Sequence, residues 1–152
     1  MSPPATHIYR RFLPHWRIDG AVYVVTWRLH QDQVRLSVLE RQQVAEMLHR
    51  FDGDRYELFA YVVMDDHVHA LLQPHDEFPL EGIVHSWKSY SAWLFQRGHR
   101  QGRVWQREYY DRIVRSRTDF DEKLRYILDN PYRRWPGIEE YPWAWSRHDA
   151  AG

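Results

Sequence analysis

The order of its regular segments constrains the fold of this 152-residue chain more than any other feature. Four stretches are expected to be strands, and the first of them is rich in Val, Tyr, Trp and Thr, a composition typical of strands. They are residues 18–29, 56–64, 67–73 and 104–114. Only Asp65 and Asp66 separate the second stretch from the third, so we expect these two strands to form a tight antiparallel hairpin.

Three further segments carry helical spacing or helix-capping signals. The first follows Ser37, an expected N-cap, and covers residues 38–51. The second covers residues 80–96. The third is expected to be capped by Thr118 and to run to about Asn130, where Pro131 ends it. We expect the aromatic tail, residues 135–145, to pack against the body of the protein without regular structure.

The first six segments run strand, helix, strand, strand, helix, strand, which matches a ferredoxin-like arrangement. We therefore predict one α+β domain over residues 1–152, with a ferredoxin-like βαββαβ antiparallel sheet and an added C-terminal helix. Two helices of such a fold cover one face of the sheet. The opposite face is then free for a ligand or for the last helix.

The composition limits the chemistry of any metal site. The chain contains no cysteine, so His, Asp, Glu, Asn or Gln must hold a bound ion. No apolar run approaches the length of a membrane span, and the N-terminus lacks the apolar core of a signal peptide. The expectation is a soluble cytoplasmic protein without a membrane partner.

The charge distribution favours a nucleic-acid partner although the formal net charge is zero. Residues 31–84 contain 11 acidic and 4 basic side chains, whereas residues 85–117 contain 2 acidic and 8 basic ones. Arginine predominates, and its planar fork suits phosphate. The arginines expected to bind DNA are Arg10, Arg11, Arg17, Arg97, Arg100, Arg103, Arg107, Arg112, Arg115 and Arg117, with surface ion pairs as the alternative. With aromatic residues at 16% of the chain, Trp87, Trp105 and Tyr109 are expected to stack on unpaired bases, or else to fill the core.

The strongest local motif is His67-Val68-His69. Residues i and i+2 of a strand point to the same face, so two imidazoles would project side by side while Val68 points to the opposite layer. Neutral imidazole is a common ligand of divalent metals. Without a metal, the pair would be ordinary surface or core histidines.

A second candidate pair is Tyr126 and Asn130, which share a helical face at i, i+4 spacing. The phenol is a candidate nucleophile, and the amide oxygen is a candidate ligand for a hard cation. A core tyrosine followed by an Asn-Pro helix end is the alternative interpretation. Tyr109 and Tyr110 are rival nucleophiles without an amide partner at i+4.

Three segments together resemble a known family. They are Met64-Asp65-Asp66-His67-Val68-His69 after an apolar run, the stretch Val104-Trp105-Gln106-Arg107-Glu108-Tyr109-Tyr110-Asp111 followed by Arg115, and Tyr126-Ile127-Leu128-Asp129-Asn130-Pro131. In this order they are similar to the signatures of the REP-associated tyrosine transposases, relatives of the single-tyrosine HUH transposases of insertion sequences. The resemblance extends from about residue 8 to residue 145.

The resemblance implies a ferredoxin-like fold, a single-stranded or hairpin DNA substrate, and Mg²⁺ or Mn²⁺ on His67 and His69. It also implies that Tyr126 is the nucleophile and forms a 5′-phosphotyrosine. Asn130 stands where insertion-sequence relatives use Gln as a third ligand, and Glu108 stands where relatives often have Gly. Two alternatives are a non-catalytic nucleic-acid-binding protein of this fold and a phosphodiesterase that uses activated water. A monomer is expected, with a homodimer as the alternative.

Overall fold

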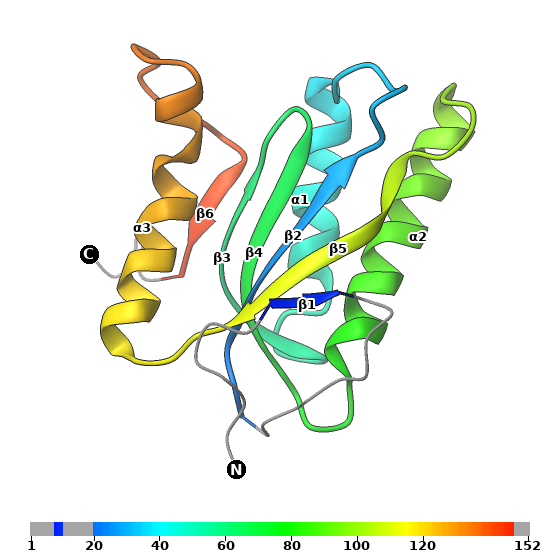
Figure 1. Ribbon diagram of the computed structural model, residues 1–152. Helices are drawn as coiled ribbons and strands as arrows, with labels where there is room; N and C mark the ends of the chain where they lie inside the picture. The colour runs from blue at the N-terminus through cyan, green and yellow to red at the C-terminus, as the bar shows by residue number, and fades with distance from the viewer. Residues whose placement is uncertain (1–7, 11–19, 148–152) are drawn as a thin grey trace.

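A computed structural model of the chain describes residues 8–10 and 20–147 (Figure 1). The described residues form six strands and three helices in one α+β arrangement. In chain order these elements are β1 (Ile8–Arg10), β2 (Tyr23–Leu29), α1 (Val38–Arg50), β3 (Tyr56–Val63), β4 (His67–Pro74), α2 (Leu80–Gly98), β5 (Trp105–Ile113), α3 (Arg117–Arg134) and β6 (Ala144–Ser146).

The six strands form one antiparallel sheet in the order β1-β5-β2-β4-β3-β6. The four central strands, with α1 and α2 between them in the chain, have the predicted ferredoxin-like topology. The hairpin of β3 and β4 turns at Asp65 and Asp66, as expected from the sequence. The short strands β1 and β6, which the sequence did not predict, extend the sheet at its two edges.

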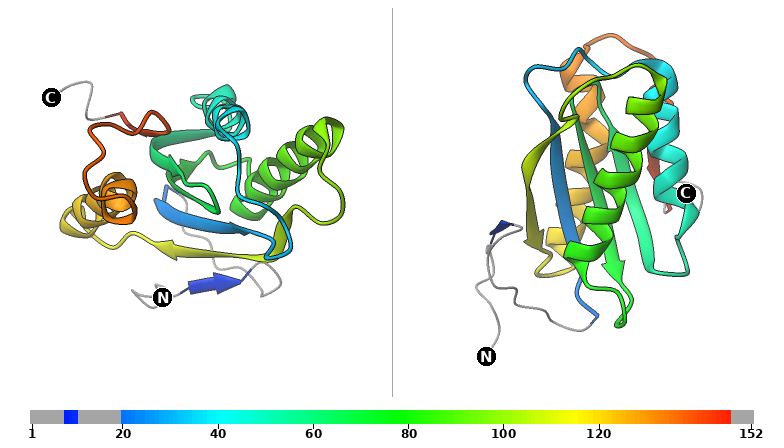
Figure 2. Two further views of the ribbon diagram at one scale, coloured as in Figure 1. Left: turned by 90° about the horizontal axis from the view of Figure 1, so that it is seen from above. Right: turned by 90° about the vertical axis from the view of Figure 1, so that its right-hand side faces the viewer.

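Helices α1 and α2 cover one face of the sheet, and α3 lies on the other (Figure 2). Ser37 caps α1, as predicted: its side chain accepts from the backbone N–H of Glu40, while the Glu40 carboxylate accepts from the N–H of Ser37. Among the described residues, no helix combines the length and apolar character needed to cross a membrane.

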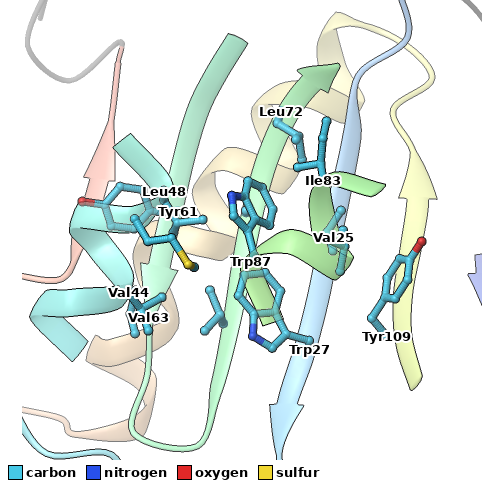
Figure 3. Packing of buried hydrophobic residues seen from close by; sticks show 14 of the residues in the cluster. Val25, Trp27, Val44, Leu48, Tyr61, Val63, Leu72, Ile83, Trp87 and Tyr109 are labelled. Carbon is cyan, nitrogen blue, oxygen red and sulfur yellow. The ribbon is translucent and has the colours of Figure 1, made fainter. Parts of the chain in front are cut away.

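The larger core lies between the sheet and the helices α1 and α2, and tryptophans dominate its centre (Figure 3). The ring of Trp27 stacks on Trp87 at 5.5 Å and meets the edge of Trp105 at 6.1 Å. Trp87, Trp105 and Tyr109 are each no more than 3% exposed. The prediction that these three rings stack on DNA bases is therefore wrong. Their surface is already buried against other side chains, which is the usual role of large aromatic residues in a core.

A smaller core anchors α3 to the other face of the sheet. Ile127 of the helix is fully buried against a group of residues from β3, β4 and the tail, namely Ala60, Val62, Met64, Leu71 and Tyr141. These contacts lie on the β3 and β4 half of the sheet. The β2 and β5 half of the same face carries no helix (Figure 2).

Helix α3 differs from its prediction at both ends. Ser116 rather than Thr118 is the N-cap, because its hydroxyl accepts the N–H of Asp119. The helix also continues through Pro131 to Arg134. The proline loses one helical hydrogen bond, but its ring is buried and its carbonyl accepts the N–H of Trp135 at 2.8 Å. The tail likewise differs from its prediction, since it forms the ordered strand β6 against β3.

Candidate active site

The two histidines of β4 lie on the sheet face that carries α3. Val68 between them is fully buried under α1 and α2, so His67 and His69 point the opposite way. Their ring centroids are 4.7 Å apart, and they are 9% and 6% exposed. The structure thus brings the two imidazoles together, as their i, i+2 spacing predicts.

Each imidazole uses its Nδ1 for a hydrogen-bond partner, one in the turn before β4 and one on β2. His67 Nδ1 donates to the Asp66 carboxylate at 2.7 Å. His69 Nδ1 lies 2.8 Å from Thr26 Oγ1, its directly opposite residue on β2. With the proton on Nδ1 and donated to Thr26, the lone pair of His69 is on Nε2. That Nε2 is buried and has no hydrogen-bond partner in the described part of the chain.

Burial keeps both imidazoles neutral. It lowers the pKa of His69 to about 3, and the nearby His67 and Arg28 act in the same direction. Burial also lowers the pKa of His67, although the bond to Asp66 opposes this effect. Near pH 7 both side chains are therefore in the form that can coordinate a metal.

Tyr126 projects from α3 beside this pair. Its ring lies 5.5 Å from the ring of His69 in an edge-to-face arrangement. It is 47% exposed, whereas Ile127, the next residue along the helix, is fully buried. The Arg133 guanidinium lies over its ring at 4.5 Å. The phenol is therefore placed beside the histidines and remains accessible to a substrate.

Asn130 follows Tyr126 by one helical turn and is 9% exposed. No group of three or more His, Cys, Asp or Glu side chains in the described ranges is arranged to hold a metal ion. A metal at His67 and His69 would therefore need a donor outside these types, and the amide oxygen of Asn130 is chemically suited to that position.

An open cleft of about 620 Å³ adjoins the histidine and tyrosine side chains. It occupies the half of the sheet face that α3 leaves uncovered. Its floor consists of Thr26, Arg28, Tyr110 and Arg112 from β2 and β5, and α3 adds Lys123 and Tyr126 at one side. The lining also includes the carboxylates of Asp111 and Glu122, so the cleft combines cationic and acidic groups with exposed aromatic rings.

The predicted DNA-binding arginines have different environments. Arg112 lies in the cleft, whereas Arg103 and Arg107 line a second groove, of about 720 Å³, between α2 and β5. Arg97, Arg115 and Arg117 are exposed. The side chain of Arg10 and the whole of Arg11 and Arg17 lie outside the described residues.

Arg100 was predicted to bind DNA, and its environment in the structure contradicts that prediction. Its guanidinium is buried and bonds both carboxylate oxygens of Glu40, at 2.6 and 2.8 Å, together with the carbonyls of Val34 and Arg35. Its donors are directed into the protein, so it is a structural residue that connects the end of α2 to the start of α1.

Several side chains around the site were not predicted from the sequence. Thr26, Arg28, Lys123 and Arg133 belong to no recognisable motif, because two elements far apart in the sequence, β2 and α3, supply them. Strand alternation on β2 does contain the signal for Thr26 and Arg28, since both alternate with Val25 and Trp27. The face of the sheet that carries the site can be identified only when the positions of the neighbouring strands are known.

An antiparallel sheet with two neutral histidines, a nearby exposed tyrosine and a cleft that carries Arg28, Arg112 and Lys123 is an arrangement suited to cleaving phosphodiesters. Comparison with known families agrees with this class, since the family described as "Transposase IS200 like" matches residues 20–130. The chain therefore belongs to the IS200-like transposase family, and it is a tyrosine transposase, a DNA-cleaving enzyme.

Among solved structures, the chain is similar to one described as a REP-associated tyrosine transposase bound to a REP hairpin. The TM-score is 0.75 and the sequence identity is 19%; the alignment covers 91% of this chain and 84% of the other. At that identity the likeness establishes the fold. A comparison with curated proteins found no match.

Proposed function

We propose that this protein nicks and rejoins single-stranded DNA through a covalent bond between Tyr126 and a 5′ phosphate. One observation carries the proposal: the exposed Tyr126 phenol lies beside His69, whose buried Nε2 has no partner in the described part of the chain. Tyr109 is buried and Tyr110 lies across the cleft on β5, which leaves Tyr126 as the exposed tyrosine in contact with the His69 ring.

The donor set fits a hard divalent cation such as Mg²⁺ or Mn²⁺. His67 and His69 would hold it through Nε2, and Asn130 would be the third protein ligand. The hydrogen bonds from Nδ1 to Asp66 and toward Thr26 fix both rings, as outer groups around metal-binding histidines generally do. When bound, the ion would supply Lewis acidity at the scissile phosphate.

The transfer step exchanges one phosphoester for another. The Tyr126 oxygen forms a bond to phosphorus, the bond from phosphorus to the 3′ oxygen breaks, the phenol loses its proton and the leaving oxygen gains one. The product pair is a 5′-phosphotyrosine and a free 3′-OH. Because the energy of the ester bond is retained, a 3′-OH from another strand can reverse the step without ATP.

The cleft supports a single-stranded segment as the reacting substrate. Arg28 and Arg112 would contact phosphates, and Tyr110, 38% exposed on the cleft floor, would stack on a base. Tyr110 would thus have the base-stacking role that was predicted for Tyr109.

A hairpin substrate, as in the solved relative, would also need a surface for its stem. The groove between α2 and β5 is suited to that partner because it carries Lys88, Arg103 and Arg107. Arg97, Arg115 and Arg117 are further candidates for phosphate contacts. Since one chain supplies both histidines and the tyrosine, we propose that a monomer suffices, which light scattering of active enzyme would test.

The deciding experiment is incubation of the full chain with Mn²⁺ and a labelled hairpin with single-stranded flanks. We expect a protein–DNA adduct that survives denaturation and disappears in Tyr126→Phe and after chelation by EDTA. Tyr132→Phe is the matched control, because Tyr132 lies on the same helix and is 41% exposed. Cleavage without an adduct would instead indicate a hydrolase, and binding alone a non-catalytic protein.

A further inference from the structure

The last turn of α3, which exists only because the helix continues through Pro131, ends at the hairpin that carries the histidines. The C-terminal end of α3 and the turn between β3 and β4 lie at the same end of the molecule (Figure 1). Arg134, the last residue of the helix, reaches that turn.

The contact joins one guanidinium to two consecutive carboxylates. Arg134 Nη2 lies 3.0 and 3.2 Å from the two oxygens of Asp65, and Nη1 lies 3.5 Å from Oδ1 of Asp66. That same Oδ1 accepts the bond from Nδ1 of His67 at 2.7 Å. Arg134 is therefore connected to a candidate metal ligand through a single carboxylate.

The turn is a firm anchor for the helix. The carbonyl of Asp65 accepts the N–H of Leu36 and the carbonyl of Asp66 accepts the N–H of Leu29, each at 2.8 Å. A second guanidinium, that of Arg35, binds the other carboxylate oxygen of Asp66 at 2.5 Å. With the turn held from the β2 side, movement at the contact would be movement of α3.

Apolar contacts hold the N-terminal part and the middle of α3 against the sheet. Ile127 packs into the small core between α3 and the sheet, and near the start of the helix Phe120 meets Phe59 of β3 edge to face at 5.4 Å. The two-carboxylate contact of Arg134 is directional. It lies two turns beyond Tyr126 on the same helix, and it joins the C-terminal end of that helix to the turn that leads into the histidine strand.

We propose that Arg134 is a positioning residue, which connects the helix of Tyr126 to the histidine strand through Asp65 and Asp66. This inference rests on the proposed role of Tyr126. Arg134 contacts neither the reacting phenol nor the histidines. Its effect is on the geometry of attack, where a displacement of about 1 Å can reduce a rate by about 100-fold.

The test compares Arg134→Gln with Arg125→Gln, a change at an exposed arginine on the same helix. We expect Arg134→Gln to slow single-turnover adduct formation by about tenfold or more. Its affinity for the hairpin, measured in a Tyr126→Phe background, should stay within about twofold, because only positioning has changed. Arg125→Gln should leave both quantities unchanged.

Two further variants separate positioning from simple loss of stability. Arg134→Lys keeps the charge but reaches one carboxylate, so its rate should lie between those of the wild type and Arg134→Gln. The exchanged pair Arg134→Asp with Asp65→Arg should recover part of the rate. The inference is overturned if Arg134→Gln reacts at the wild-type rate, or if the rate falls only in proportion to the melting temperature with no recovery in the exchanged pair.

Amide hydrogen exchange makes the result independent of activity. In Arg134→Gln the amides of residues 131–135 should exchange faster, while those of β3 and β4 remain protected. Unchanged exchange would refute the contact's positioning role even if the wild-type protein formed no adduct. An absent wild-type adduct together with faster exchange would refute the proposed function and leave the connection between helix and turn intact.

Discussion

The two faces of the sheet come from the same strands but have opposite characters. On β2, Val25 and Trp27 are fully buried under α1 and α2, while Thr26 and Arg28 reach the cleft on the α3 side. The helix pair α1 and α2 packs over the larger core on the first face, whereas α3 covers only half of the second. Stability is therefore concentrated on one face, and the other can keep polar groups beside solvent.

The arginines show the same division. Arg100 is closed into a bidentate pair with Glu40 and has no donor left for a ligand, whereas Arg112 lies on the floor of the cleft. Both belong to one basic stretch of the sequence. A charge run thus identifies a region that contains DNA-binding candidates without separating them from structural cations.

The largest expected effect comes from comparing a buried aromatic residue of the core with an exposed one in the cleft. Trp87→Ala should lower the free energy of unfolding by about 4 kcal/mol, because it opens a cavity beside Trp27 in a dry core. Tyr110→Ala should change that free energy by less than about 0.5 kcal/mol, but it should weaken single-strand binding by about 1–3 kcal/mol. Urea denaturation and fluorescence anisotropy measure the two quantities. The comparison between faces fails if Trp87→Ala is stable and loses only DNA affinity.

The ferredoxin-like fold and the histidine pair could be predicted because they depend on local periodicity. Strand alternation is enough to place His67 and His69 on one face opposite Val68, and the capping residue Ser37 marks the start of α1. The continuation of α3 past Asn130 to Arg134 could not be predicted, because burial of Pro131 offsets the hydrogen bond that its ring removes.

The burial of individual aromatic and basic residues depends on tertiary packing. Tyr109 and Tyr110 are neighbours in the sequence, but strand alternation sends the first into the core and the second into the cleft. The local sequence does not show which of the two alternating faces of β5 is buried. The packing of α2 against the sheet decides it. The same holds for Arg100, whose partner Glu40 is 60 residues away.

The second effect in size concerns the two arginines. Arg100→Met should lower the free energy of unfolding by about 3 kcal/mol, since it leaves the Glu40 carboxylate buried without its cation. Arg112→Met is the matched change in the cleft, and we expect unchanged stability with a smaller salt dependence of DNA binding. If Glu40→Gln combined with Arg100→Met is as unstable as Arg100→Met alone, the stranded carboxylate is not the cause.

The smallest effect is the pH dependence of the same ion pair. Burial raises the pKa of Glu40, but the hydrogen bonds and charge of Arg100, together with Ser37, overcome this and hold the pKa below its usual value of 4.5. A carboxyl group whose pKa is lower in the folded state stabilises the fold above the unfolded-state pKa, and this contribution is lost as the pH falls through the folded-state pKa. Glu40→Gln should therefore be less stable than the wild type near pH 7, and the difference should shrink below about pH 4.5. Thermal unfolding of both proteins from pH 3 to pH 7 measures this difference in stability. A constant difference across that range would show that the charge of Glu40 contributes nothing to the stability of the fold.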